Sequence, residues 1–204
     1  MKYQNKKNKG FTLIEMMVAI AVFSIVMVMA MGALLNVIDS NNKARSIKTA
    51  INNISFALEG ISKDVRMGTD YACGDGGSTV EQDCADGVDT ISFKSSKTTG
   101  GGDPYVYYQY IITGGVGQMQ SCLSSAGIST CTGSYSPLTS SELTLDSVKF
   151  YVLGVTHSKD PAVTRTQPRV IIVIKGTAGN KNKVKTQTTF DLQTGISQTS
   201  RIKI

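Results

Sequence analysis

The sequence predicts an α+β protein in which one long N-terminal helix precedes a β-rich region. An uncharged apolar run from Met16 to Ile38 indicates a membrane-spanning first half of that helix. Apolar residues spaced three and four apart from Ala44 to Val65 indicate an amphipathic second half. Beyond Asp70, short segments rich in β-branched and aromatic residues alternate with clusters of Gly, Ser, Asp and Pro. We therefore expect the amphipathic half to pack on an antiparallel β-sheet.

The positive charge of the chain is concentrated at its start. The 204 residues, enough for one domain and an extended element, carry a net charge of +6. Residues 1–10 contain four lysines and no acidic residue, whereas the rest of the chain has 17 basic and 15 acidic residues. This distribution signals membrane topology and does not indicate nucleic-acid binding. The four lysines are Lys2, Lys6, Lys7 and Lys9.

The apolar run is long enough to cross a membrane. It has 23 residues, and only Ser24 and Asn36 within it are clearly polar. Spanning the hydrocarbon core takes about 20 residues in a helix. A secretory signal peptide has its apolar core before the cleavage site, whereas here the basic leader and Gly10 come first. The lysines therefore place the N-terminus in the cytoplasm and send the chain after about residue 40 to the outer side.

An amphipathic helix is expected to continue from the membrane span through residues 39–68. Gly68, Thr69 and Asp70 supply the stop signal, so a helix from Phe11 to Met67 would be roughly 85 Å long. The apolar residues along this helix form a stripe that could pack either against another helix, as a coiled-coil seam, or against a sheet made by the rest of the chain. We favour the sheet. The members of the stripe are Val37, Ala44, Ile47, Ile51, Ile54, Leu58, Ile61 and Val65.

The four cysteines form two local pairs in the sequence. Cys73 and Cys84 are eleven residues apart, and Cys122 and Cys131 are nine apart, all after the membrane span. An even number of cysteines outside the membrane favours two small disulfide-closed loops in an oxidising compartment. Neither pair has the spacing of a structural zinc site, so we predict no metal ligation by these residues.

The region 69–204 is expected to form four or five antiparallel strands that end in a hairpin. Two long loops are predicted in it, one at residues 69–90 and the other at Gly114–Pro137, because both are rich in Gly, Ser and Asp. In the last predicted strand, Val184, Thr186, Thr188, Phe190 and Leu192 share one face. The expected strands are Val88–Lys94, Tyr105–Thr113, Leu143–Thr156, Arg169–Lys175 and Val184–Leu192.

No catalytic constellation is visible in the sequence. His157 is the single histidine, and its neighbours Ser158, Lys159 and Asp160 are typical of a surface turn. No nucleophile elbow, zinc-protease helix or phosphate-binding loop occurs, so the chain is not expected to be an enzyme.

Two groups of side chains give weak signals of ligand binding. An acidic cluster suggests a calcium site, because calcium prefers carboxylate oxygens as ligands. Its spacing does not match an EF-hand loop, and a solvated disulfide loop would also account for these residues. The cluster comprises Asp75, Glu81, Asp83, Asp86 and Asp89. Tyrosines 105, 107, 108 and 110 are expected to form half-buried cross-strand pairs in preference to a stacking surface for bases or sugars. No cofactor is therefore predicted.

The block Lys9-Gly10-Phe11-Thr12-Leu13-Ile14-Glu15, with the basic leader before it and the apolar helix after it, carries a family resemblance. It resembles the class III signal of type IV pilins and type II secretion pseudopilins. The resemblance implies that a prepilin peptidase cuts after Gly10, that Phe11 becomes the N-methylated first residue, and that residues 1–10 are a cleaved leader. It also implies a pilin-like fold, in which the second half of the helix cradles an antiparallel sheet.

Glu15 is the one carboxylate inside the apolar block, and two roles are open to it. In a monomer it could snorkel to the cytoplasmic surface at small cost. In a filament, the α-amino group that cleavage creates at Phe11 of one subunit could pair with Glu15 of its neighbour. Such a pair would set the register of assembly, since breaking either half leaves a buried charge uncompensated. Thr12 is interpreted as a small residue at the helix start.

Two further features bear on the kind of subunit. Type IV major pilins usually have a helix-breaking proline at the position that Gly32 holds here, and this chain has no proline before Pro104. That difference favours a minor pilin or a pseudopilin. The closing segment from Phe190 to Thr194, with Ser197 and Gln198 after it, resembles the ending of J-type minor pseudopilins and W-type minor pilins.

The expected function is that of a structural subunit of a type IV pilus or type II secretion filament, with an extracytoplasmic C-terminal domain. The partners implied are the prepilin peptidase and methyltransferase, other pilin or pseudopilin subunits, the inner-membrane assembly platform and the lipid bilayer. An alternative is a membrane-tethered or filament-borne module that captures secreted protein, DNA or a surface. A single-pass anchored enzyme is disfavoured by the missing catalytic residues.

Overall fold

A computed structural model describes residues 10–74, 82–96, 104–124, 131, 134–140, 143–155, 167–179 and 187–199. The chain divides into two units, Met1–Asn42 and Lys43–Ile204. In the first unit the described residues are the non-helical Gly10–Thr12 and the first part of helix α1, Leu13–Met67. The helix passes through Gly32 without a break, because glycine keeps the backbone donor that proline would remove. The uninterrupted N-terminal helix agrees with the sequence prediction, apart from its start at Leu13 instead of Phe11.

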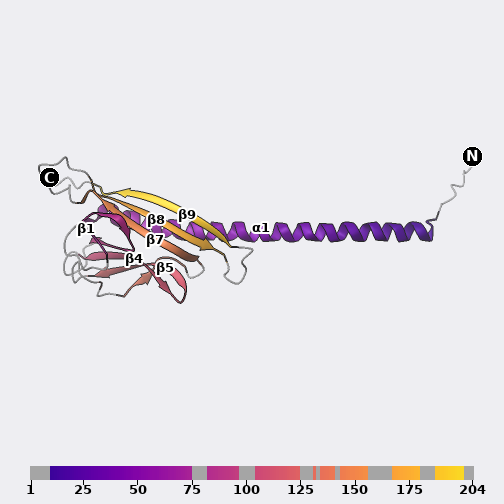
Figure 1. Ribbon diagram of the computed structural model, residues 1–204, viewed down its shortest axis with the longest axis horizontal. Coiled ribbons are helices and arrows are strands. Elements are labelled where there is room, and N and C mark those ends of the chain that lie inside the picture. The colour runs from indigo at the N-terminus through magenta and orange to yellow at the C-terminus, as the bar shows by residue number, and fades with distance from the viewer. Residues whose placement is uncertain are drawn as a thin grey trace, which may run out of the picture. The chain divides into compact units, whose positions relative to one another are not determined.

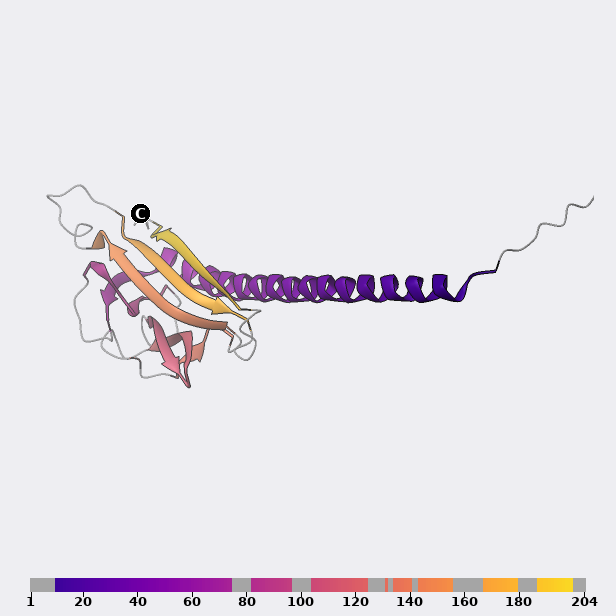
Figure 2. The ribbon, with the colours of Figure 1, turned by 45° about the vertical axis from the view of Figure 1, so that its right-hand side comes forward.

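In its described residues, the second unit contains the rest of α1 and nine strands in two antiparallel sheets (Figure 1). The five-stranded sheet has the order β1-β3-β4-β5-β6, and the four-stranded sheet has the order β2-β7-β8-β9. Figure 2 shows β7, β8 and β9 side by side, coloured from orange to yellow. The first sheet comprises β1 Thr69–Cys73, β3 Thr90–Lys94, β4 Tyr105–Thr113, β5 Val116–Ser124 and β6 Ser136–Pro137. The second comprises β2 Cys84–Val88, β7 Leu143–Leu153, β8 Arg169–Ala178 and β9 Thr188–Ser197.

The α+β class is confirmed, but the prediction of one sheet with four or five strands is wrong. The predicted loop at residues 69–90 contains β1 and β2, which find partners in β3 and β7. The predicted loop Gly114–Pro137 contains β5, which pairs with β4 along its whole length. Gly114 and Gly115 form the turn of this hairpin with φ of 60° and 73°, a conformation that glycine adopts without strain.

The last strand also lies later in the sequence than predicted. Strand β9 begins at Thr188 and pairs with β8 through Ser197, whereas the prediction ran from Val184 to Leu192. Val184 and Thr186 lie outside the described residues. Within β9, Thr188, Phe190 and Leu192 are partly buried and alternate with exposed residues. This agrees with the prediction that they share one face, since side chains of a strand alternate between its two faces.

The core of the second unit joins α1 to both sheets, which agrees with the predicted packing of the amphipathic half on a sheet and not with a coiled-coil seam. Phe93 and Met119 come from the first sheet and Phe150 from the second, and all three are fully buried. The helix face that they cover differs in part from the predicted stripe, because Ala44 and Ile51 are exposed. The buried helix residues are Ala50, Ile54, Ala57, Ile61 and Val65.

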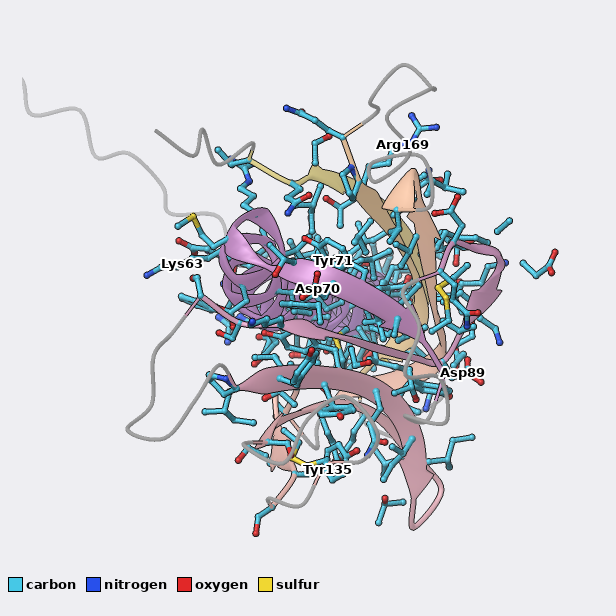
Figure 3. All side chains as sticks on the ribbon, turned by 90° about the vertical axis from the view of Figure 1, so that its left-hand side faces the viewer. Lys63, Asp70, Tyr71, Asp89, Tyr135 and Arg169 are labelled. Carbon is cyan, nitrogen blue, oxygen red and sulfur yellow. A yellow bond between two sulfur atoms is a disulfide. The ribbon has the colours of Figure 1, made fainter. Side chains whose placement is uncertain are left out.

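The C-terminal end of α1 is held by groups from distant parts of the chain. The Tyr71 hydroxyl, labelled in Figure 3, donates hydrogen bonds to the carbonyl oxygens of Val65 and Gly68. Gln198 Nε2 donates to the Gly68 carbonyl at 2.7 Å, and the Thr199 N–H donates to the Arg66 carbonyl at 2.9 Å. These bonds satisfy carbonyl groups that have no partner within the helix.

Candidate functional site

The predicted cleavage point lies in accessible, non-helical backbone. Gly10 and Phe11 precede the first turn of α1, and 75% of Phe11 is exposed. No atom of the described chain comes within 4 Å of where a Cβ on Gly10 would lie. The Gly10–Phe11 peptide bond therefore lies before the helix, in backbone that is exposed within the described chain.

Thr12 and Glu15 form a reciprocal capping box at the helix start. The Thr12 Oγ1 accepts a hydrogen bond from the Glu15 N–H at 3.3 Å, and Glu15 Oε2 accepts one from the Thr12 N–H at 3.4 Å. The Thr12 carbonyl accepts the first intrahelical bond, from Met16. This geometry makes Thr12 the N-cap and explains why α1 begins at Leu13. The T-x-x-E spacing was visible in the sequence, but its capping role was missed there.

The apolar part of α1 is uncovered in the described chain. Every residue from Gly10 to Arg45 is exposed. The Ser24 hydroxyl donates to the Ile20 carbonyl at 2.8 Å, which satisfies its donor inside the helix. By length and composition, α1 is able to cross a membrane. An apolar surface of this extent needs lipid or other apolar helices around it.

Both local cysteine pairs form disulfides in the second unit. The Cys73–Cys84 bond links the end of β1 to the start of β2, with their Cα atoms 5.9 Å apart. The Cys122–Cys131 bond starts from β5, and its Cα atoms are 6.2 Å apart. No free cysteine is found in the described part of the chain. The disulfides join residues that are 11 and 9 positions apart, and each reduces the conformational freedom of the unfolded chain.

The tyrosines of β4 serve packing and hydrogen bonding within the second unit. Tyr108 donates from its hydroxyl to Asp64 Oδ2 at 2.9 Å, and burial and this carboxylate raise its pKa. Tyr110 donates to the Leu145 carbonyl at 3.0 Å and to the Asp146 carbonyl at 2.9 Å, and burial is the main cause of its raised pKa. Burial, with the neighbouring Tyr135 and Tyr105, raises the pKa of Tyr107 to about 12. Burial also raises the pKa of Tyr71.

The acidic residues considered for calcium do not converge where they are described. Asp83 Oδ1 accepts a hydrogen bond from the Val155 N–H at 2.7 Å, and Asp89 pairs with Lys149 at 2.9 Å. Among the described residues, no group of three or more His, Cys, Asp or Glu side chains is placed to hold a metal ion. Asp75 and Glu81 lie outside the described residues, so the calcium hypothesis stays a prediction. His157, the histidine that any catalysis would need, also lies outside them.

Comparison with known proteins identifies the same segment. A family model described as the prokaryotic N-terminal methylation motif matches residues 5–31, which include Gly10, Phe11, Thr12 and Glu15. Neither the curated proteins nor the solved structures give a match to the chain. The long apolar helix and the antiparallel sheets are consistent with the pilin-like fold that the motif implies. The chain thus carries the prepilin-type N-terminal methylation motif of type IV pilin-like proteins.

Proposed function

We propose that this chain is a structural subunit, a minor pilin or pseudopilin, of a type IV pilus or type II secretion filament. A prepilin peptidase cuts it after Gly10, a methyltransferase modifies the amine of Phe11, and the apolar part of α1 packs against other subunits. The observation that carries the proposal is the accessible Gly10–Phe11 bond directly before a capped apolar helix, inside a matched methylation motif.

The hydrogen bonds at the helix start support a change of partner for Glu15 during assembly. The Thr12 N–H lies 3.4 Å from Glu15 Oε2, beyond the 2.7–3.2 Å usual for such bonds, so little free energy is lost when this bond opens. The α-amino group of Phe11 in a neighbouring subunit would carry a positive charge, so its bond to the Glu15 carboxylate would join two opposite charges, whereas the Thr12 N–H is a neutral donor. Exchange of the cap for this amine would fix the register between subunits.

The cysteines support an extracytoplasmic place for the second unit. Disulfides persist in oxidising compartments and are rare in the cytosol. Both cysteine pairs follow the apolar run in the sequence, so a single span with a cytoplasmic N-terminus would put them outside. The subunit would insert by its helix and display the β-rich unit on the surface or at the tip of the filament.

The mechanism needs no catalytic turnover by the chain itself. Its partners are the enzymes that process it, an inner-membrane assembly platform and other pilin-like subunits. The helix supplies apolar contact area, Glu15 selects the register, and the β-rich unit gives the subunit its individual surface.

Mass spectrometry of the N-terminus tests the proposal directly. The chain is expressed with and without a prepilin peptidase, and the mature protein should begin at Phe11 and carry one added methyl group. A Gly10→Val variant is the matched control, since it keeps the helix and the leader but should block cleavage. Retention of Met1 in the mature protein, in cells where another prepilin is processed, would refute the proposal.

A further inference from the structure

Three of the four sheet edges in the described part of the chain are interrupted. The first sheet ends at β1 and β6, and the second ends at β2 and β9. Strands β1 and β2 each have an irregular register with their partner strand, and β6 has only 2 residues. Bulges and short edge strands keep other chains from pairing with a sheet. These three edges are therefore poor templates for a further strand.

Strand β9 lacks all of these protections. Its 10 residues pair with β8 without a shift of register. It contains no proline and no basic residue, and Asp191 is the one charged residue between Thr188 and Ser197. Natural edge strands are commonly protected by lysine, by proline or by a bulge. Among the described edges, β9 is thus the long and regular one.

The backbone groups on the free side of β9 belong to its odd-numbered residues. The Gln198 N–H donates to the Pro168 carbonyl at 2.9 Å, and bonding positions alternate along an antiparallel strand. With the regular register, even-numbered residues of β9 therefore bond to β8, and odd-numbered residues point their N–H and C=O groups to the free side. Only an extended polypeptide offers N–H and C=O groups at the spacing of such a row. The outward-pointing residues are Thr189, Asp191, Gln193, Gly195 and Ser197.

The side chains beside this edge define what an added strand should carry. Phe190 and Leu192 face the core but are only partly buried. On the neighbouring strand β8, Ile172 and Ile174 are fully buried. Apolar side chains opposite Phe190 and Leu192 would remove them further from water. Asp191 lies exposed on the other face, where a basic residue opposite it would form a cross-strand pair of opposite charges.

We infer that β9 binds an extended segment of a different protein as an added antiparallel strand. The segment has apolar residues at alternate positions and a basic residue opposite Asp191. A second copy of this chain fits less well, since three of its described edges are interrupted and its β9 has no basic residue to offer. The inference goes beyond the proposed function and requires neither cleavage nor filament assembly.

The test uses the full-length chain in neutral detergent and a labelled, end-blocked peptide, Thr-Val-Thr-Val-Lys-Val-Thr. In an antiparallel pair that starts opposite Gly195, its lysine faces Asp191 and its last two valines face Leu192 and Phe190. Two N-methylated forms are matched to each other. Methyl groups on the third and fifth amides remove donors that face β9, whereas methyl groups on the second and fourth amides lie on the far side. Fluorescence anisotropy measures binding, and empty micelles give the background.

Two substitutions at one position supply the protein control. Gln193 points its N–H to the free side, so Gln193→Pro blocks the edge and leaves the bonds to β8 in place. Gln193→Ala keeps the donor. Gln193→Ala should bind the peptide within about twofold of the wild type, and Gln193→Pro at least about tenfold more weakly. Circular dichroism checks that both are folded, and the methylated peptides test the edge in the wild type without any substitution.

Amide exchange at single-residue resolution shows how the peptide binds. Peptide at about ten times its dissociation constant should slow exchange of the Asp191 and Gln193 amides about tenfold. The Phe190 and Leu192 amides, which bond to β8, should change by less than about twofold.

Several results would overturn the inference. They are equal binding of the two methylated peptides, protection without the odd-even alternation, and no binding at about 1 mM peptide. Protection that rises with protein concentration in the absence of peptide would assign the edge to a second copy and overturn the choice of partner. The N-terminus does not enter these measurements, so their failure leaves the proposed function standing.

Discussion

Tyr108 and Asp64 join strand β4 to the last turns of α1 through a 2.9 Å hydrogen bond between the hydroxyl and the carboxylate. The two residues are 44 positions apart in the sequence, so the bond fixes the helix on the first sheet. Tyr108→Phe should lower the free energy of unfolding of the second unit by about 1–3 kcal/mol, the usual range for a bond to a charged group. Chemical denaturation of the full chain in detergent measures it. Tyr151→Phe is the control, because the Tyr151 hydroxyl has no hydrogen bond among the described residues; an equal loss in that variant would contradict the assignment.

Gly117 in β5 lies against the backbone of the second sheet. A Cβ at this position would lie 1.8 Å from the Leu145 carbonyl oxygen and 2.8 Å from the Tyr110 hydroxyl. Gly117→Ala must therefore push the two sheets apart, with an expected loss of about 3 kcal/mol or more. Gly195→Ala in β9 is the matched control, since no described atom lies within 4 Å of where a Cβ would be, and it should be close to neutral. Similar thermal melting of both variants would show that the sheets do not meet at Gly117.

Glu15→Gln separates the two tasks of the carboxylate. Glutamine keeps a side-chain oxygen that can accept from the Thr12 N–H, so exchange protection of the Thr12 amide should stay within about twofold of the wild type. Loss of the negative charge should nevertheless impair filament assembly, because the amine of a neighbouring Phe11 loses its partner. Sedimentation of sheared filaments measures assembly, and membrane fractionation checks insertion.

Thr12→Val gives the complementary result at the other half of the capping box. It removes the hydroxyl that accepts from Glu15, so amide exchange in the first turn should accelerate about tenfold, which corresponds to a typical N-cap contribution. Normal assembly of Glu15→Gln would remove the register role from Glu15. Unchanged exchange in Thr12→Val would remove the capping role from Thr12.

The buried tyrosines predict a loss of stability at high pH. Tyr107 has an ordinary pKa of 10.0 that folding raises to about 12, so the folded state holds the phenolic proton more tightly than the unfolded state. The stabilisation is complete below pH 10 and is lost as the pH rises from 10 to about 12. Tyr107→Phe should flatten this decline in the melting temperature of the full chain. An identical alkaline profile in the variant would show that other groups cause it.

The parts of the fold that could be predicted are those with a strong local signal. The apolar run and the β-branched segment from Val170 to Ile174 show their structure in residue type alone. Strand β5 was missed because two of its buried positions are Gly117 and Ser124, which carry little hydrophobic signal. Only the Gly114-Gly115 turn signalled a hairpin. Strands β1 and β2 are short and depend on partners that are distant in the sequence.

The buried face of α1 was only partly predictable for a different reason. The stripe was assigned from large apolar residues, whereas the structure buries Ala50 and Ala57 and exposes Ile51. Small side chains let a helix approach its neighbours closely, but in a sequence they carry little hydrophobic signal. At the candidate site, the sequence predicted roles for Gly10, Phe11 and Glu15, and these roles stay predictions inside the matched motif. The cap by Thr12 needed the geometry of the helix start.

The bonds from Gln198 and Thr199 to the end of α1 have a mechanical consequence. A pull on the helix passes through the carbonyls of Gly68 and Arg66 into the segment that directly follows β9. Strand β9 pairs with β8 from Thr188 to Ser197, and hydrogen bonds of antiparallel strands run perpendicular to the strands. Force along the strand would therefore load many of these bonds together in shear instead of opening them one after another. Strand β9 and the C-terminal end of α1 would therefore resist a pulling force together.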